Sequence, residues 1–96
     1  MGWFKRTFQN TPEARIERAT LFIDRKDYNN ARLELDGLDQ TEAQNMLNKA
    51  LMGLVELNLK EAEARFSADD NEGAMEHLKL AKNFGASSDQ IRTIQK

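Results

Sequence analysis

The chain has 96 residues, of which 31% are charged, and it contains no cysteine. This length predicts one domain with a modest core, and the lack of cysteine excludes disulfides and thiolate metal sites. A net charge of −2 does not favour general nucleic-acid binding, which requires a basic surface.

The charge is distributed unevenly along the sequence. Before Glu34, seven basic residues stand against four acidic ones, so this part carries +3 and the remainder carries −5. Such asymmetry is typical of a protein with a partner surface. The start lacks the apolar run of a signal peptide, and no segment is apolar enough to span a membrane. We therefore expect a cytoplasmic protein.

Residues 1–10, MGWFKRTFQN, form a segment of different character ahead of a helical domain at residues 11–96. The segment gathers aromatic and basic residues, namely Trp3, Phe4, Phe8, Lys5 and Arg6. On a short helix Phe4 and Phe8 share a face, and one interpretation is an anchor that makes weak contact with a membrane surface or a partner. The alternative is that the aromatic side chains pack onto the domain, or that the segment frays as chain ends often do.

The first helix is predicted from Pro12 to about Lys26. Thr11 is suited to cap it, Pro12 loses no hydrogen bond at the first position, and Glu13 complements the helix dipole. Asp27 is suited to cap a second helix, and Gly37 to end it. The apolar faces carry Ile16, Ala19, Phe22 and Ile23 on the first helix, and Tyr28, Ala31, Leu35 and Leu38 on the second. Because the link is short, the two helices should form an antiparallel hairpin.

The longest helix is predicted from Thr41 to Phe66, where Thr41 and Gln44 have the spacing of a capping box. Two apolar stripes run along it, whereas a helix lying on one core needs a single stripe. The first stripe consists of Leu47, Leu51, Leu54, Val55, Ala62 and Phe66, and the second of Met46, Ala50, Gly53 and Leu57. This helix should therefore be covered from two sides.

A polar stretch at residues 67–71 ends the long helix. Asp69 and Glu72 have capping-box spacing for the next helix, which Gly85 should end. Ser87 and Gln90 repeat that spacing before a last helix. The apolar positions are Ala74, Leu78 and Ala81, followed by Ile91 and Ile94. The chain is thus predicted to be all-α, with two antiparallel hairpins and a short C-terminal helix.

The two predicted bends are similar in sequence. Each places an Asp four residues before an Ala, which in turn stands four residues before a Leu (Asp27, Ala31 and Leu35; Asp70, Ala74 and Leu78). The first hairpin resembles a tetratricopeptide repeat in its pattern of small and large residues at Ala19, Phe22, Tyr28, Ala31 and Leu35. The two alanines lie 43 residues apart, whereas that family repeats about every 34 residues. A lengthened middle helix accounts for the difference.

The resemblance implies a fragment of a right-handed solenoid, in which the first helices of successive hairpins line a groove for a peptide or a partner helix. Two units fall short of the three normally needed, so either the chain is part of a longer protein or something else covers the open face. Some members of the family grip a terminal carboxylate with a Lys or Arg and an Asn on the first helix. The corresponding positions here are Ile16 and Thr20, so that mode of binding is not expected.

Candidate partner-binding residues lie on the first and longest helices. One flank of the first helix carries Arg15, Arg18, Leu21 and Arg25. Arginine is suited to forked contacts with carboxylates of a partner, and the alternative is an ordinary solvated face. Leu57 stands at the end of the second stripe, and Leu59 fits neither stripe. They are either buried by a helix covered on two sides or form an exposed patch that needs another chain.

No catalytic or metal-binding pattern stands out, and no cofactor is expected. His77 is the single histidine, and the sequence lacks the zinc-protease and phosphate-loop motifs. The acidic run at 69–72 lacks the spacing of a calcium loop, and helix capping accounts for it. We therefore expect a non-enzymatic adaptor or scaffold that binds a protein partner. The alternatives are a homodimeric assembly protein and a peripheral membrane protein.

Overall fold

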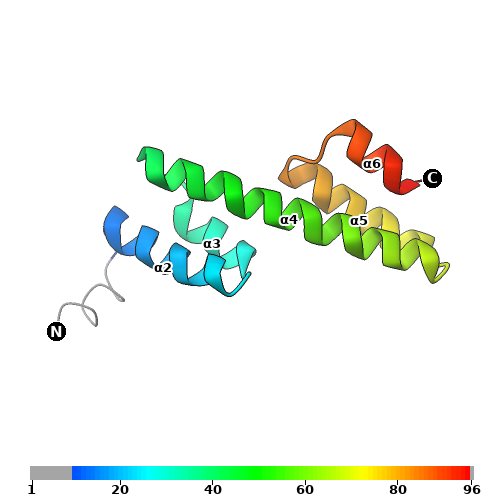
Figure 1. The fold of residues 1–96 in the computed structure, drawn as a ribbon, viewed down its shortest axis with the longest axis horizontal. Helices are drawn as coiled ribbons and strands as arrows, with labels where there is room; N and C mark the ends of the chain where they lie inside the picture. Colours follow the sequence, from blue (N-terminus) through cyan, green and yellow to red (C-terminus); the bar gives the residue numbers. More distant parts are fainter. Residues whose placement is uncertain (1–9, 96) are drawn as a thin grey trace. The chain divides into compact units, whose positions relative to one another are not determined.

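The computed structural model describes residues 10–95, and this part of the chain is all-α (Figure 1). It contains five helices and no strand, namely α2 (Pro12–Asp24), α3 (Tyr28–Leu35), α4 (Thr41–Ser67), α5 (Asn71–Phe84) and α6 (Ser88–Gln95). The predicted fold class is confirmed. The chain divides into two compact units, of which the first ends at Ala50 and the second begins at Leu51. The boundary therefore lies within α4.

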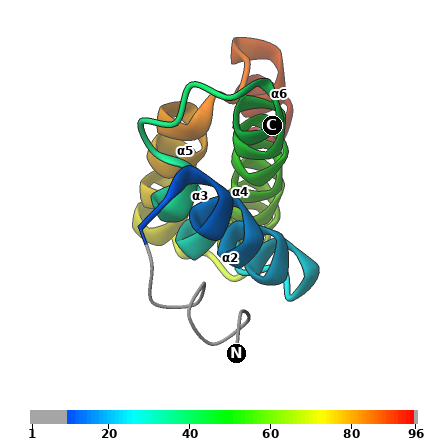
Figure 2. The same cartoon turned by 90° about the vertical axis from the view of Figure 1, so that its left-hand side faces the viewer.

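In the first unit, α2 and α3 lie side by side and are joined by a short bend (Figure 1, Figure 2). Arg15 of α2 contacts Asp36 just beyond α3, and Arg18 contacts Glu34 within it. Residue numbers rise along one helix as they fall along the other, so the pair is the predicted antiparallel hairpin. The core of this unit is built mainly from alanine, with Ala19, Ala31, Leu35, Ala43 and Ala50 all buried. Small side chains at these contacts allow close approach of the helices.

Larger apolar side chains surround this alanine-rich core and remain partly accessible. They come from α2, α3, the following loop and the start of α4, and they are Ile16, Phe22, Ile23, Tyr28, Leu38, Met46 and Leu47. Leu38 was predicted to lie on the second helix. It instead lies after α3, which ends at Leu35, because Gly37 adopts a left-handed conformation with φ of +78°.

In the second unit, α4 from Leu51 onward packs against α5. His77 of α5 lies with its Nδ1 3.0 Å from Oδ1 of Asn58, and the guanidinium of Arg65 pairs with Asp70 at 3.0 Å. These contacts again run in opposite directions along the chain, which makes the second predicted hairpin antiparallel. The core consists of Ala62, Ala74 and Leu78, and Leu59, Phe66, Ile91 and Ile94 pack against it. The last two side chains attach α6 to the unit, as the sequence predicted.

The bend from α2 to α3 begins two residues earlier than predicted. α2 ends at Asp24, and Lys26, expected to be helical, has φ of +60°. The N–H of Asp27 donates to the carbonyl of Phe22 at 2.8 Å, and the N–H of Lys26 donates to the carbonyl of Ile23 at 2.9 Å. This pair of bonds is a Schellman motif, which ends a helix with one left-handed residue. Lysine occupies the position where glycine is usual.

The bend from α4 to α5 has the same backbone geometry. The N–H of Asp70 donates to the carbonyl of Arg65 at 2.8 Å, and the N–H of Asp69 donates to the carbonyl of Phe66 at 3.1 Å. Asp69 has φ of +60°. The predicted cap at Asp69 is wrong by one residue, because Asp69 is the left-handed residue of the turn that follows α4. Asp70 is the cap and accepts from the N–H of Gly73 at 2.9 Å. The similarity seen in sequence thus extends to the backbone.

The remaining caps largely follow the sequence. The hydroxyl of Thr11 accepts from the N–H of Ala14 at 3.2 Å, and the Asp27 carboxylate accepts from that of Asn30 at 3.4 Å. Ser87 and Gln90 form a reciprocal capping box with bonds of 2.9 and 3.1 Å. Gly85 ends α5 with φ of +115°. Thr41 differs, because it is the first residue within α4 rather than the cap before it.

Each half of α4 contributes to the core of its own unit. Ala43 and Ala50 are buried in the first unit, and Ala62 in the second. The predicted second stripe is not buried along its whole length, since Leu57 is 50% exposed. Ala50 of the second stripe and Ala62 of the first stripe are buried as predicted, whereas Leu57 is not.

The cap of α5 predicts a pH dependence of stability. The N–H of Gly73, together with the guanidinium of Arg65, holds the pKa of Asp70 below its ordinary value of 3.8. Because the folded pKa is the lower one, ionised Asp70 stabilises the fold above about pH 4, and this contribution is lost as pH falls through the folded pKa. Asp70→Asn retains a capping oxygen without titrating. In urea unfolding, this variant should lose less stability between about pH 6 and about pH 3 than the wild type.

Asp39→Asn is the matched control, because Asp39 is an exposed acid outside the helices. This variant should follow the wild-type pH profile. Parallel profiles for the wild type and Asp70→Asn would contradict the assignment of Asp70 as the titrating cap.

Candidate functional site

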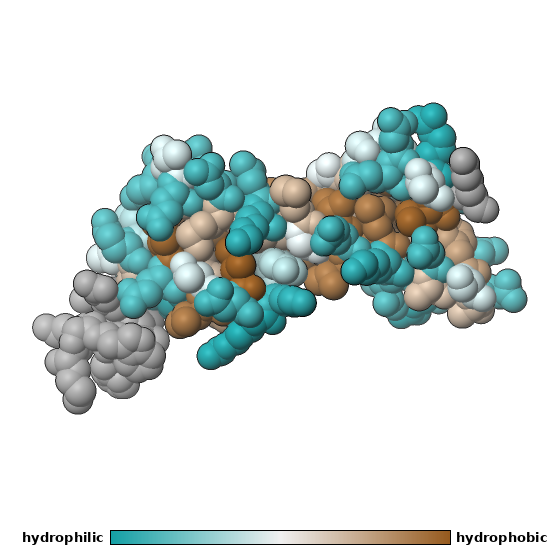
Figure 3. Space-filling view, viewed as in Figure 1, coloured by the Kyte–Doolittle hydropathy of each residue, from teal (hydrophilic) through white to brown (hydrophobic). Residues whose placement is uncertain are grey.

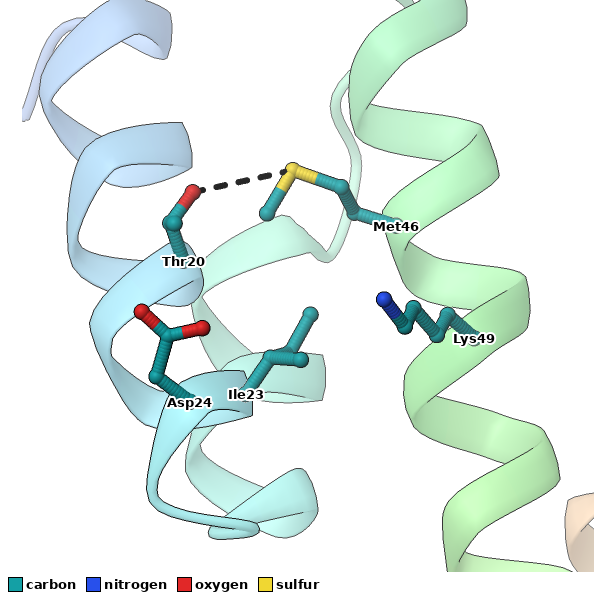
Figure 4. Close-up of a pocket in the computed structure, with 5 residues that line it drawn as sticks. All are labelled: Thr20, Ile23, Asp24, Met46 and Lys49. Carbon is teal, nitrogen blue, oxygen red and sulfur yellow. Dashed lines mark hydrogen bonds between the residues drawn. The ribbon is translucent and has the colours of Figure 1, made fainter.

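The first unit contains an open pocket between α2 and the start of α4 (Figure 4). Its volume is about 230 Å³, and its lining comes from Thr20, Ile23, Asp24, Met46 and Lys49. Ile23 and Met46 supply apolar surface. Asp24 on α2 and Lys49 on α4 supply opposite charges from opposite walls (Figure 4). The pocket therefore offers an apolar contact between one anionic and one cationic group.

The polar groups of the pocket differ in whether they already have partners. The hydroxyl of Thr20 donates to the carbonyl of Ile16 at 3.0 Å and lies 4.0 Å from the sulfur of Met46. Asp24 and Lys49 are exposed, and within residues 10–95 neither side chain forms a hydrogen bond or an ion pair. The two charges are therefore available to an incoming group.

Two of the four predicted residues on α2 make contacts within their own unit. Arg18 forms a forked ion pair with Glu34, with Nε at 2.6 Å from Oε2 and Nη2 at 3.1 Å from Oε1. The side chains of the pair are only 17% and 23% exposed. The hydrogen bond to Glu34 raises the pKa of Arg18 above its ordinary value. Nη2 of Arg15 donates to the carbonyl of Asp36 at 2.9 Å.

Sequence reasoning missed the role of Glu34. The available signal was its place in the antiparallel hairpin, since Glu34 follows the bend at Asp27 by about as many residues as Arg18 precedes it. An acid and a base that lie side by side on two antiparallel helices are expected to form an ion pair. Arg15 and Arg18 therefore hold the hairpin together.

The other two predicted residues on α2 are exposed. Leu21 is 45% exposed and stands three residues before Asp24, which makes the two side chains neighbours on the helix surface. Leu21 thus extends the apolar surface beside the pocket. Arg25 is also exposed. The sequence did not identify Ile23, Met46 or Lys49 as binding residues.

The two candidate leucines of α4 have different environments. Leu57 is 50% exposed, whereas Leu59 packs against the core of the second unit. Leu57 is therefore exposed and Leu59 is partly buried, so the predicted burial of both leucines does not hold. Other large apolar side chains exposed in the second unit are Met52, Met75 and Leu80. On the face drawn in Figure 3, apolar atoms reach the surface in both units among hydrophilic ones.

The predicted aromatic and basic anchor, namely Trp3, Phe4, Lys5, Arg6 and Phe8, lies outside the described residues. It stays a prediction. Among residues 10–95, no helix is both long and apolar enough to cross a bilayer. The same residues contain no group of three potential metal-binding side chains.

Comparisons of the chain with protein-family models, curated proteins and solved structures found no significant match. The resemblance to tetratricopeptide repeats therefore rests on the sequence pattern and stays a prediction.

The forked Arg18–Glu34 pair should contribute measurably to stability. In a double-mutant cycle with Arg18→Gln and Glu34→Gln, we expect a coupling free energy of about 1 kcal/mol, above that of most exposed pairs, because the geometry is forked and the groups are partly buried. Urea unfolding of the wild type, the two single variants and the double variant gives this value.

Arg92 and Asp89 on α6 provide a matched control. They lie 3.1 Å apart, but their side chains are 71% and 90% exposed. Their cycle should give a coupling near zero. Equal coupling in the two cycles would contradict a structural role for Arg18.

Proposed function

We propose that this chain is a non-enzymatic interaction module, an adaptor or scaffold, that binds a segment of a partner protein in the pocket between α2 and α4. The observation that carries the proposal is the pocket itself, where apolar surface lies between two charged side chains that have no partner within residues 10–95. A contact surface of this composition, apolar at its centre and charged at its edge, is typical of protein recognition.

The location of the pocket agrees with the tetratricopeptide-like interpretation. In that family the first helices of successive hairpins line the groove, and α2 and α4 are the first helices of the two hairpins here. Thr20, one of the two positions that the resemblance assigns to ligand contact, lines the pocket.

The two sides of α2 have separate tasks under this proposal. Arg15 and Arg18 hold the helix to α3 and its following loop. Thr20, Ile23 and Asp24 are turned toward the pocket. Leu21, exposed beside Asp24, provides additional apolar contact for a partner. We place the module in the cytoplasm, a reducing compartment with which a chain free of cysteine is compatible.

Self-assembly and membrane attachment remain alternative proposals. The exposed Leu57 and Met52 favour self-assembly, and a solution mass that equals the single chain at every concentration would argue against it. Membrane attachment depends on residues 1–10. Attachment through residues 1–10 would be excluded if deletion of this segment left co-sedimentation with anionic liposomes unchanged.

Filling the pocket should weaken partner binding without disturbing the fold. Thr20 is exposed, so Thr20→Trp places a large side chain in the pocket while leaving the buried alanines intact. A partner isolated with the wild-type chain should be purified and its affinity measured by calorimetry. We expect Thr20→Trp to weaken binding at least about tenfold, the effect of about 1.4 kcal/mol.

Thr93→Trp is the matched control. Thr93 is also an exposed helical threonine, and its hydroxyl donates to the carbonyl four residues earlier at 2.8 Å, as that of Thr20 does. This variant should bind the partner as the wild type does. Equal affinity of the Thr20 variant and the wild type would contradict binding at the pocket.

A further inference from the structure

The charges around the pocket specify the kind of segment that fits it. We propose, on the basis of the proposed function, that the pocket selects a peptide segment in which one apolar side chain stands between a basic and an acidic residue. The apolar side chain would contact Ile23 and Met46, the basic residue would pair with Asp24, and the acidic residue with Lys49.

The size of the pocket favours a single side chain. Its volume of about 230 Å³ is below the roughly 300 to 1,000 Å³ of sites that enclose a small molecule. Ile23 and Met46 both pack against the core of the unit, so their side chains are held in place by buried residues. Met46 is unbranched and adapts its shape to different apolar groups. A side chain such as leucine is therefore a suitable anchor.

The opposite charges select the residues that flank the apolar side chain. Asp24 belongs to α2 and Lys49 to α4, so the two charges lie on different walls of the pocket (Figure 4). A segment with two like charges would meet repulsion at one wall, whereas one base and one acid would satisfy both. The hydroxyl of Thr20 is already bonded to Ile16, so charge recognition falls to these two residues.

The position of Asp24 supports a binding role over a structural one. Asp24 is the last residue of α2, and the last turn of this helix carries no basic residue. The carbonyl groups at a helix C-terminus disfavour a nearby negative charge. Asp24 therefore gains no stabilisation from its own helix, and a basic group from a partner would neutralise it. Asp24→Asn should consequently leave the unfolding midpoint of the free chain unchanged or higher while weakening binding.

The test is a peptide-display selection with a randomised library on the full wild-type chain and on two variants, Asp24→Lys, which presents two cations, and Lys49→Asp, which presents two anions. Both positions are exposed, so either charge reversal leaves the core intact. The wild type should enrich segments with an apolar residue between one base and one acid, whereas Asp24→Lys should enrich acids on both sides of it and Lys49→Asp should enrich bases on both sides. Asp24→Asn and Lys49→Gln should each weaken binding of an enriched peptide about twofold to fivefold, as for exposed ion pairs.

Two controls separate the outcomes. Lys60→Gln changes another exposed lysine of α4 and should leave affinity unchanged. If all three proteins enrich apolar peptides without a charge pattern, and Thr20→Trp abolishes their binding, the charge inference is wrong and the proposed function survives. If the wild type and the two reversal variants enrich the same flanking charges, the inference is also wrong. If none of the three enriches any peptide that Thr20→Trp rejects, the pocket does not bind peptides and both proposals fail.

Discussion

The candidate site depends on the fixed orientation of α2 about its own axis, which decides which side chains face α4. Arg18 holds one flank of this helix to Glu34 of α3 through two parallel hydrogen bonds, and such forked contacts restrict geometry more than a single bond does. On a helix with 3.6 residues per turn, Thr20 lies nearly opposite Arg18. Holding Arg18 against α3 therefore directs Thr20, and Asp24 one turn later, toward the start of α4.

The alanine-rich core complements this constraint. Ala19 of α2 and Ala31 of α3 are fully buried in the core of the first unit. Ala43 and Ala50 of α4 are buried in the same core. Because small residues fill the centre of the unit, the larger Ile23 and Met46 are left at its edge, where they form the apolar part of the pocket. The same packing that stabilises the unit thus leaves apolar surface available for binding.

Much of the fold could be predicted from sequence because its signals are local. The caps at Thr11, Asp27 and Ser87 each involve residues three apart, and the structure confirms them. The errors at Lys26 and Asp69 share one cause. Each residue adopts a left-handed backbone that glycine usually supplies, and only the following Asp, by capping the next helix, indicates that the chain bends there.

The candidate site was harder to predict because it combines distant parts of the sequence. Lys49 and Asp24 come from different helices, and helical periodicity within one segment cannot show that two walls face each other. The arginines on α2 were selected for their chemistry, but that chemistry is used within the hairpin at Arg18. Periodicity also could not distinguish Leu57 from Leu59, since burial at these positions depends on where α5 packs.

The most direct test of the account is nuclear magnetic resonance of the chain labelled with carbon-13 at its methionine methyl groups. The sequence has four methionines, of which Met46 lines the pocket, whereas Met52 and Met75 are exposed in the second unit. On titration with a purified partner segment, the account predicts that the Met46 signal shifts and saturates while those of Met52 and Met75 stay in place. Shifts at Met52 or Met75 with an unchanged Met46 signal would contradict binding between α2 and α4.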